Sequence, residues 1–189
     1  MTTLGFSKKD ITPDFPVSLA GYLADRPAAG IHDRLYARAL AFLAAREKYV
    51  LLVLDLLHLD RVCIEKLYQG ITRFGLTGEN LLVCCTHTHS GFGGIFDNTP
   101  LNRAMLPLFG SYNERAVEWV IQKSFEAVEE ALQNGVAATV KMRNGVINGL
   151  GTNRHDPALP CDRNLFSIEF FRADGKKILP IIFPAIRPC

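Results

Sequence analysis

Apolar and polar positions along this chain form short apolar or alternating runs typical of β-strands, and two stretches with helical periodicity. The expected strands lie at 5–12, 35–44, 49–57, 81–85, 138–146, 165–171 and 178–186. Helices are expected over 60–74 and 112–134, where apolar residues recur every three or four positions. This order predicts an α/β or α+β fold with a mixed β-sheet and flanking helices.

Residues at the ends of these segments support the same elements. Asp60 is expected to cap the first helix, and Gly75 to stop it. Asn113 is expected to cap the second helix and Gly135 to end it. Asp55 ends a strand, where a carboxylate can serve an active site or cap the following helix, and both interpretations stay open.

Composition and charge narrow the possible classes of protein. With 189 residues, the chain is expected to form a single domain, 1–189, or part of a larger one. A net charge of +2 gives nucleic-acid binding no electrostatic support. No apolar run approaches the roughly 20 residues of a membrane span. The N-terminus lacks the apolar core of a signal peptide, so a cytoplasmic location is expected.

The five cysteines are an odd number and include no C-x-x-C spacing, so a cysteine zinc cluster is not expected. Cys63, Cys84 and Cys85 lie in apolar segments and are expected to be small buried hydrophobic residues.

The most informative stretch is 84–94, where an apolar strand runs into a glycine-rich loop containing His87 and His89. In extended backbone, residues two apart point to the same side, so both imidazoles are expected to face one way. Such a pair can supply one metal ligand and one acid–base or polarising group. Two loop histidines can also be ordinary polar surface, and zinc sites usually gather three or four ligands.

A long loop at 13–33, rich in proline, glycine and alanine, precedes these strands. Loops of this length within compact domains are often functional. His32 is followed by Asp33, so it is either an oriented histidine or a structural histidine in a turn.

Several separated motifs, in this order, together resemble the N-terminal catalytic part of the neutral/alkaline, non-lysosomal ceramidases. The matching stretches are Asp10-Ile11-Thr12-Pro13, Gly21-Tyr22, Gly30-Ile31-His32, Arg38-Ala39, Asp55, Thr86-His87-Thr88-His89-Ser90-Gly91, Asn153-Arg154 and the hairpin at 166–188. The resemblance spans essentially the whole chain, and the ordered set is more specific than any single motif.

The resemblance implies a zinc-dependent hydrolase of sphingolipid metabolism that cleaves the amide of N-acylsphingosine, giving sphingosine and a fatty acid. It implies that His87 is a zinc ligand, that His89 holds the substrate or the nucleophile, and that Arg154 orients the polar head of the lipid. Members of this family are often secreted or membrane-associated.

Three departures from the family pattern indicate that the catalytic site of this chain is incomplete. Phe92 stands where the family has proline, and Arg187 stands where a second zinc histidine belongs. Arginine stays protonated and offers no lone pair to a metal. The nucleophilic serine, two further zinc ligands and an immunoglobulin-like domain of the family would all lie beyond residue 189. An incomplete catalytic domain is therefore expected, or a non-catalytic homologue that keeps only the fold.

The last expected strand, 178–186, is apolar and reaches almost to the end of the chain. An uncovered apolar strand invites association, so poor solubility or self-association is expected.

Overall fold

The computed structural model describes residues 2–22, 25–44, 47–96, 106–149, 153, 156–159 and 162–184. The chain divides into two compact units, Thr3–Gly135 and a second unit made chiefly of Val136–Cys189. Each is described by itself.

The first unit is built on four strands in the order β4-β3-β2-β1. These are β1 (Thr2–Asp10), β2 (Tyr36–Ala44), β3 (Glu47–Leu54) and β4 (Leu81–Cys85). The first three pair antiparallel, whereas β3 and β4 run parallel, so the sheet is mixed as predicted. The parallel pair brings the carboxyl ends of β3 and β4 to the same edge of the sheet.

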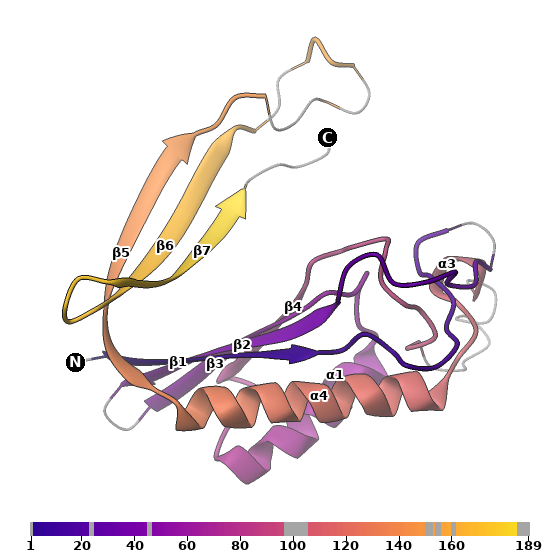
Figure 1. The fold of residues 1–189 in the computed structure, drawn as a ribbon, viewed down its shortest axis with the longest axis horizontal. Helices are drawn as coiled ribbons and strands as arrows, with labels where there is room; N and C mark the ends of the chain where they lie inside the picture. Colours follow the sequence, from indigo (N-terminus) through magenta and orange to yellow (C-terminus); the bar gives the residue numbers. More distant parts are fainter. Residues whose placement is uncertain are drawn as a thin grey trace. The chain divides into compact units, whose positions relative to one another are not determined.

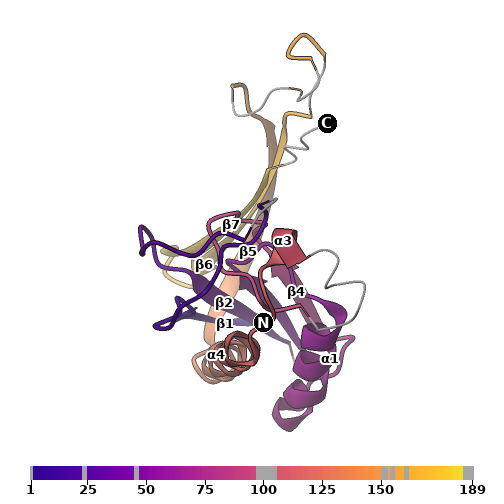
Figure 2. The same cartoon turned by 90° about the vertical axis from the view of Figure 1, so that its right-hand side faces the viewer.

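Helices α1 (Arg61–Gly70) and α4 (Glu114–Gln133) lie on one face of this sheet (Figures 1 and 2). A 3₁₀ turn, η1 (Ile71–Phe74), extends α1, and a short helix, α3 (Leu106–Phe109), precedes α4. The expected N-caps are present: Asp60 accepts a hydrogen bond from the amide of Cys63, and Asn113 from that of Ala116. The expected C-cap of α4 was wrong by one residue, because Asn134 rather than Gly135 is the cap, and its amide donates to the carbonyl of Glu130. Gly75 ends the turn in the left-handed conformation.

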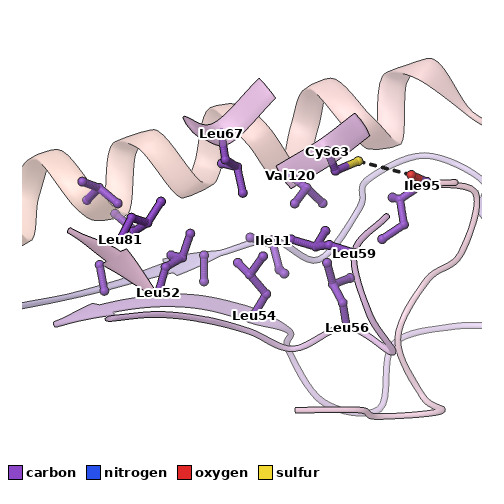
Figure 3. Packing of buried hydrophobic residues seen from close by; sticks show 14 of the residues in the cluster. Ile11, Leu52, Leu54, Leu56, Leu59, Cys63, Leu67, Leu81, Ile95 and Val120 are labelled. Atoms are coloured by element: carbon purple, nitrogen blue, oxygen red, sulfur yellow. Dashed lines mark hydrogen bonds between the residues drawn. The ribbon is translucent and has the colours of Figure 1, made fainter. Parts of the chain in front are cut away.

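The core of this unit lies between the two helices and the sheet (Figure 3). Leu52 and Leu54 of β3 pack there with Leu67 of α1 and Val120 of α4, all without exposed area. The fully buried β2 residues of this core are all alanines, namely Ala37, Ala39 and Ala41. Small side chains let α4 approach the strands closely.

Strand β4 is more exposed than the expected burial of its cysteines implied. It is the edge of the four-stranded order, and its residues alternate between buried and exposed. Leu82 is 63% exposed, and Cys84 is exposed as well. The expectation of a buried Cys84 was therefore wrong, because the strand has only one covered face. Cys63 is buried as expected, and Cys85 is half-buried.

Two strands also end a few residues before the positions that the sequence predicted. β1 stops at Asp10 because that carboxylate accepts the amide of Thr12 and turns the chain before Pro13. β3 stops at Leu54, whose carbonyl accepts the amides of Leu56 and Thr86. The chain after β3 therefore turns beside the end of β4.

The second unit contains an antiparallel sheet in the order β5-β6-β7. Its strands are β5 (Val136–Val146), β6 (Asn164–Arg172) and β7 (Lys177–Pro184). The predicted closing hairpin is present, with Gly175 at a φ of +81° in its turn.

Candidate functional site

The histidine segment begins where β4 ends, beside the chain that leaves β3. The amide of Thr86 donates to the carbonyl of Leu54 at 2.9 Å, and that of His87 to the carbonyl of Leu56 at 3.0 Å. These bonds continue the pairing of the two strand ends into the loop. The segment is therefore fixed to the sheet at the edge where parallel strands present their carboxyl ends.

His87 is the one non-glycine residue of the described part with a positive φ, at +60°. Its Nδ1 lies 2.9 Å from the carbonyl oxygen of Leu57. A carbonyl only accepts, so a neutral ring must carry its hydrogen on Nδ1. The lone pair on Nε2 is then left for another partner.

His89 is held in the same way by a different part of the chain. Its Nδ1 lies 3.1 Å from the carbonyl oxygen of Gly21, 68 positions earlier in the sequence. The ring of Tyr22 meets the His89 ring edge to face at 6.3 Å, and the Arg26 guanidinium stacks on Tyr22 at 4.6 Å. The long loop thus reaches the histidine segment.

The rings of His87 and His89 lie 5.5 Å apart, close to perpendicular, and both side chains are exposed. The sequence predicted a shared side from extended backbone, but β4 has already ended at Cys85. The left-handed turn at His87 and the two carbonyl contacts bring the rings together instead.

His58 is a neighbour that the sequence analysis did not single out. Its ring lies 4.0 Å from that of Phe96 and 5.1 Å from that of Phe109. Burial lowers the pKa of His58 below its usual range, and the nearby His87 lowers it further, while Asp60 opposes both. A half-buried, uncharged imidazole therefore lies beside the exposed pair. Its position right after a strand end was the only signal in the sequence.

Asp55, whose role the sequence left open, is part of an ion pair. Its carboxylate lies 2.7 Å from an Arg38 guanidinium nitrogen and accepts the amide of Tyr36 at 2.9 Å. The Asp55 side chain is 14% exposed. It ties β2 to the chain after β3 and does not cap α1. The charged Arg38 within an apolar strand was the sequence signal for such a partner.

A cavity of about 900 Å³ opens between the loop at 12–35 and the histidine segment. Its wall is mostly apolar, with Phe15 and Phe92 among its lining residues, while Asp55, Thr88 and Ser90 add polar groups. His87 and His89 are not among the lining residues. The histidine segment therefore contributes the polar side chains of Thr88 and Ser90 to the wall of the cavity.

The remaining loop histidine, His32, is 97% exposed and pairs with Asp33 at 2.8 Å. It contributes to the wall of the cavity and does not join the pair. This arrangement fits a histidine oriented by its neighbour on the surface of a turn.

The fit of these residues to a zinc ion is partial. An imidazole held through Nδ1 with a free Nε2 lone pair is a common arrangement for a metal ligand, and His87 has it. Within the described ranges, however, no group of three or more His, Cys, Asp or Glu side chains can hold a metal ion. Arg154 and Arg187 lie outside the described residues. The described residues therefore offer one suitably held imidazole and no complete ligand set.

Comparison with known proteins identifies the family. The family model "Neutral/alkaline non-lysosomal ceramidase, N-terminal" matches residues 3–162. The neutral ceramidase of Mycobacterium tuberculosis is 29% identical over 179 residues, covering 88% of this chain and 28% of the relative.

Solved structures share the fold. The crystal structure of neutral ceramidase from Pseudomonas aeruginosa matches with a TM-score of 0.84 at 23% identity, over 97% of this chain and 31% of that one. A structure described as ceramidase complexed with C2 matches with a TM-score of 0.82 at 23% identity, over the same shares. The chain spans less than a third of the length of these relatives. With most of its sequence matched by the family model, the chain belongs to the neutral/alkaline non-lysosomal ceramidases and corresponds to their N-terminal part.

Proposed function

We propose that this chain is the N-terminal portion of a zinc-dependent ceramidase that hydrolyses N-acylsphingosine to sphingosine and a fatty acid. The observation that carries the proposal is the pair of imidazoles 5.5 Å apart at the carboxyl edge of the parallel strands. Family membership makes an amide of this class the first substrate to consider.

His87 is the residue proposed to hold zinc, through Nε2, because its Nδ1 is already engaged by the Leu57 carbonyl. A bound zinc ion would polarise the amide carbonyl or lower the pKa of a bound hydroxyl group. Further ligands would have to include residues outside the described ranges, since one imidazole does not make a zinc site.

His89 is proposed to act on the substrate or the nucleophile. With Nδ1–H directed at Gly21, its Nε2 can accept a hydrogen bond from a hydroxyl group and take its proton. Arg154, in the proposal, orients the polar head of the lipid. These roles rest on family membership together with the observed ring geometry.

A second candidate is a non-catalytic homologue that retains only the fold. The observation that favours it is the incomplete ligand set of the described chain. Substitution of His87 or His89 separates the two candidates, because neither ring would affect zinc binding or catalysis in a protein that retains only the fold.

A chimera tests the proposal. Residues 1–184 of this chain would replace the corresponding part of the Pseudomonas aeruginosa enzyme, guided by the superposition at a TM-score of 0.84, so that Arg187 is not carried into the chimera. We expect the chimera to hydrolyse a fluorescent ceramide, and His87→Ala to remove bound zinc and at least about a thousandfold of activity. Glu65→Ala, at an exposed position of α1 in the same unit, should leave both unchanged.

A folded chimera that binds no zinc and has no activity would instead support the non-catalytic homologue. Circular dichroism and thermal unfolding of the chimera establish that it is folded before activity is interpreted. Loss of activity in Glu65→Ala equal to that in His87→Ala would also count against the assigned roles.

A further inference from the structure

The backbone at Gly21 meets the ring of His89 at unusually close range. Gly21 has a φ of +91°, and a Cβ placed there would lie 2.2 Å from Nδ1 of His89 and 2.7 Å from Cε1. Real Cβ atoms do not approach other heavy atoms so closely. Only a residue without a side chain allows the His89 ring to lie against this carbonyl.

Main-chain hydrogen bonds fix the loop at this point. The amide of Gly21 donates to the carbonyl of Leu108 at 2.6 Å, and the amide of Ala20 donates to the carbonyl of Gly91 at 3.2 Å. Leu19 and Phe92 add an antiparallel bridge. The backbone at Gly21 is therefore held by main-chain contacts to the histidine segment and to α3.

We infer that Gly21 is the positioning residue for His89, holding its ring through the Nδ1–H hydrogen bond and leaving Nε2 free for the substrate. The inference rests on the proposed function only for what Nε2 then contacts. The positioning itself is a property of the free protein. Tyr22, edge to face with the same ring, restricts its rotation from a second side.

The His89 tautomer in the unmodified chain is the direct test. Nitrogen-15 spectra of the imidazoles at pH 8.5, about two units above the ordinary histidine pKa, report which ring nitrogen carries the hydrogen. We expect His89 to show a protonated Nδ1 and an unprotonated Nε2. A predominantly Nε2-protonated His89 would overturn the inference without any variant.

The matched variants are Gly21→Ala and Gly30→Ala, both in the same loop. A Cβ at Gly30 meets nothing within 4 Å, so Gly30→Ala should leave the His89 spectrum unchanged. In Gly21→Ala the displaced ring should lose its Nδ1 partner, shifting the tautomer ratio by about fivefold, which corresponds to one neutral hydrogen bond. An unchanged His89 spectrum in a folded Gly21→Ala would contradict the inference.

His87 serves as an internal control. Its Nδ1 is bonded to the Leu57 carbonyl, which Gly21→Ala does not touch, so its signals should stay in place if the fold is intact. If Gly21→Ala unfolds the chain, the double variant Gly21→Ala/His89→Ala should recover at least part of the folded population, because the ring is gone. No recovery would show that the loss came from the backbone alone and would count against the inference.

This test and the chimera assay fail independently. The tautomer is read in the chain without zinc, lipid or turnover. A correct tautomer with an inactive chimera would leave Gly21 as the positioning residue and reject the proposed hydrolase.

Discussion

At the residue scale, the two histidines show what local sequence can and cannot predict. The presence of a histidine pair after an apolar strand was visible from 81–89, and the structure brings the rings together. How the two rings are brought together could not be predicted, because it depends on the left-handed backbone of His87 and on a carbonyl 68 positions away from His89. Long-range backbone contacts leave no periodic signal in a sequence.

The two adjacent cysteines should differ in reactivity. Burial, and then the neighbouring Cys84, raises the pKa of Cys85 to about 11, with a small opposing effect from a backbone hydrogen bond at Leu59. The thiolate of Cys85 at pH 8 is therefore about a hundredfold scarcer than that of an ordinary thiol. We expect iodoacetamide to modify the exposed Cys84 first, as read by peptide mass spectrometry.

The pH dependence of Cys85 labelling tests the same prediction. A raised thiol pKa keeps Cys85 protonated, so its labelling rate should rise about tenfold per pH unit until pH approaches its pKa. Cys84→Ser is the control that isolates Cys85. Equal labelling of both cysteines at pH 8 would show that Cys85 is not protected.

At the element scale, the sequence was most reliable where a strand or helix carried its own end signals. The strands β2 and β3, both N-cap residues and the long helix α4 were predicted and are confirmed. The edge position of β4 was not predicted, because strand order depends on contacts between distant segments. An apolar run such as 81–83 looks the same at the edge and in the centre of a sheet.

Removing the Asp60 cap should destabilise helix α1. Asp60 is 8% exposed and accepts the Cys63 amide at 2.8 Å, so Asp60→Ala leaves a buried donor without this partner. We expect a loss of about 1–2 kcal/mol in the free energy of unfolding, measured in urea. Asp60→Asn keeps an accepting oxygen and should lose clearly less. Equal losses in the two variants would mean that the cap is not the cause.

The close approach of α4 to β1 should make Gly5 irreplaceable. A Cβ at Gly5 would lie 1.7 Å from the carbonyl oxygen of Ala131, which belongs to a helix backbone and cannot rotate away. Gly5→Ala should therefore lower the free energy of unfolding by at least about 3 kcal/mol, or prevent folding.

The control for this prediction is Gly78→Ala in the same unit. Its Cβ would meet only the ring of Tyr68, at an ordinary contact distance of 3.5 Å. We expect a change within about 0.5 kcal/mol. Calorimetric unfolding of both variants measures the difference, and a small loss in Gly5→Ala would mean that α4 can shift away from β1.

At the scale of the whole molecule, the mixed sheet with flanking helices was predicted from element order and is confirmed. The single domain over 1–189 stays a prediction. The structure divides the chain into two compact units, and each unit has its own strands. None of the described helices combines the length and apolar character needed to cross a membrane.

The second unit carries an apolar surface that should drive self-association. Val140, Met142 and Val146 of β5 share one side of the strand with Phe166, which pairs opposite Asn144 on β6. Their exposed fractions are 44%, 79%, 70% and 50%, respectively. We propose that the chain alone forms oligomers through this side, so its mass by light scattering should rise with concentration.

Two charged substitutions separate this surface from the rest of β5. Met142→Lys should shift the chain toward the monomer, because a charge is costly in an apolar contact. Thr139→Lys, on the other side of the strand, should leave the association unchanged. A monodisperse monomer at high concentration in light scattering would contradict the proposed self-association.

Both histidines of the pair are anchored to main-chain carbonyls, those of Leu57 and Gly21. A carbonyl is the same group whatever side chain its residue carries, so point substitutions at Leu57 leave that anchor in place. Inserting or deleting one residue between the end of β3 and Leu57 would move the carbonyl away from the ring. Divergence in this part of the molecule would therefore be limited by the length of its connections more than by the identity of their residues, with Gly21 as the exception.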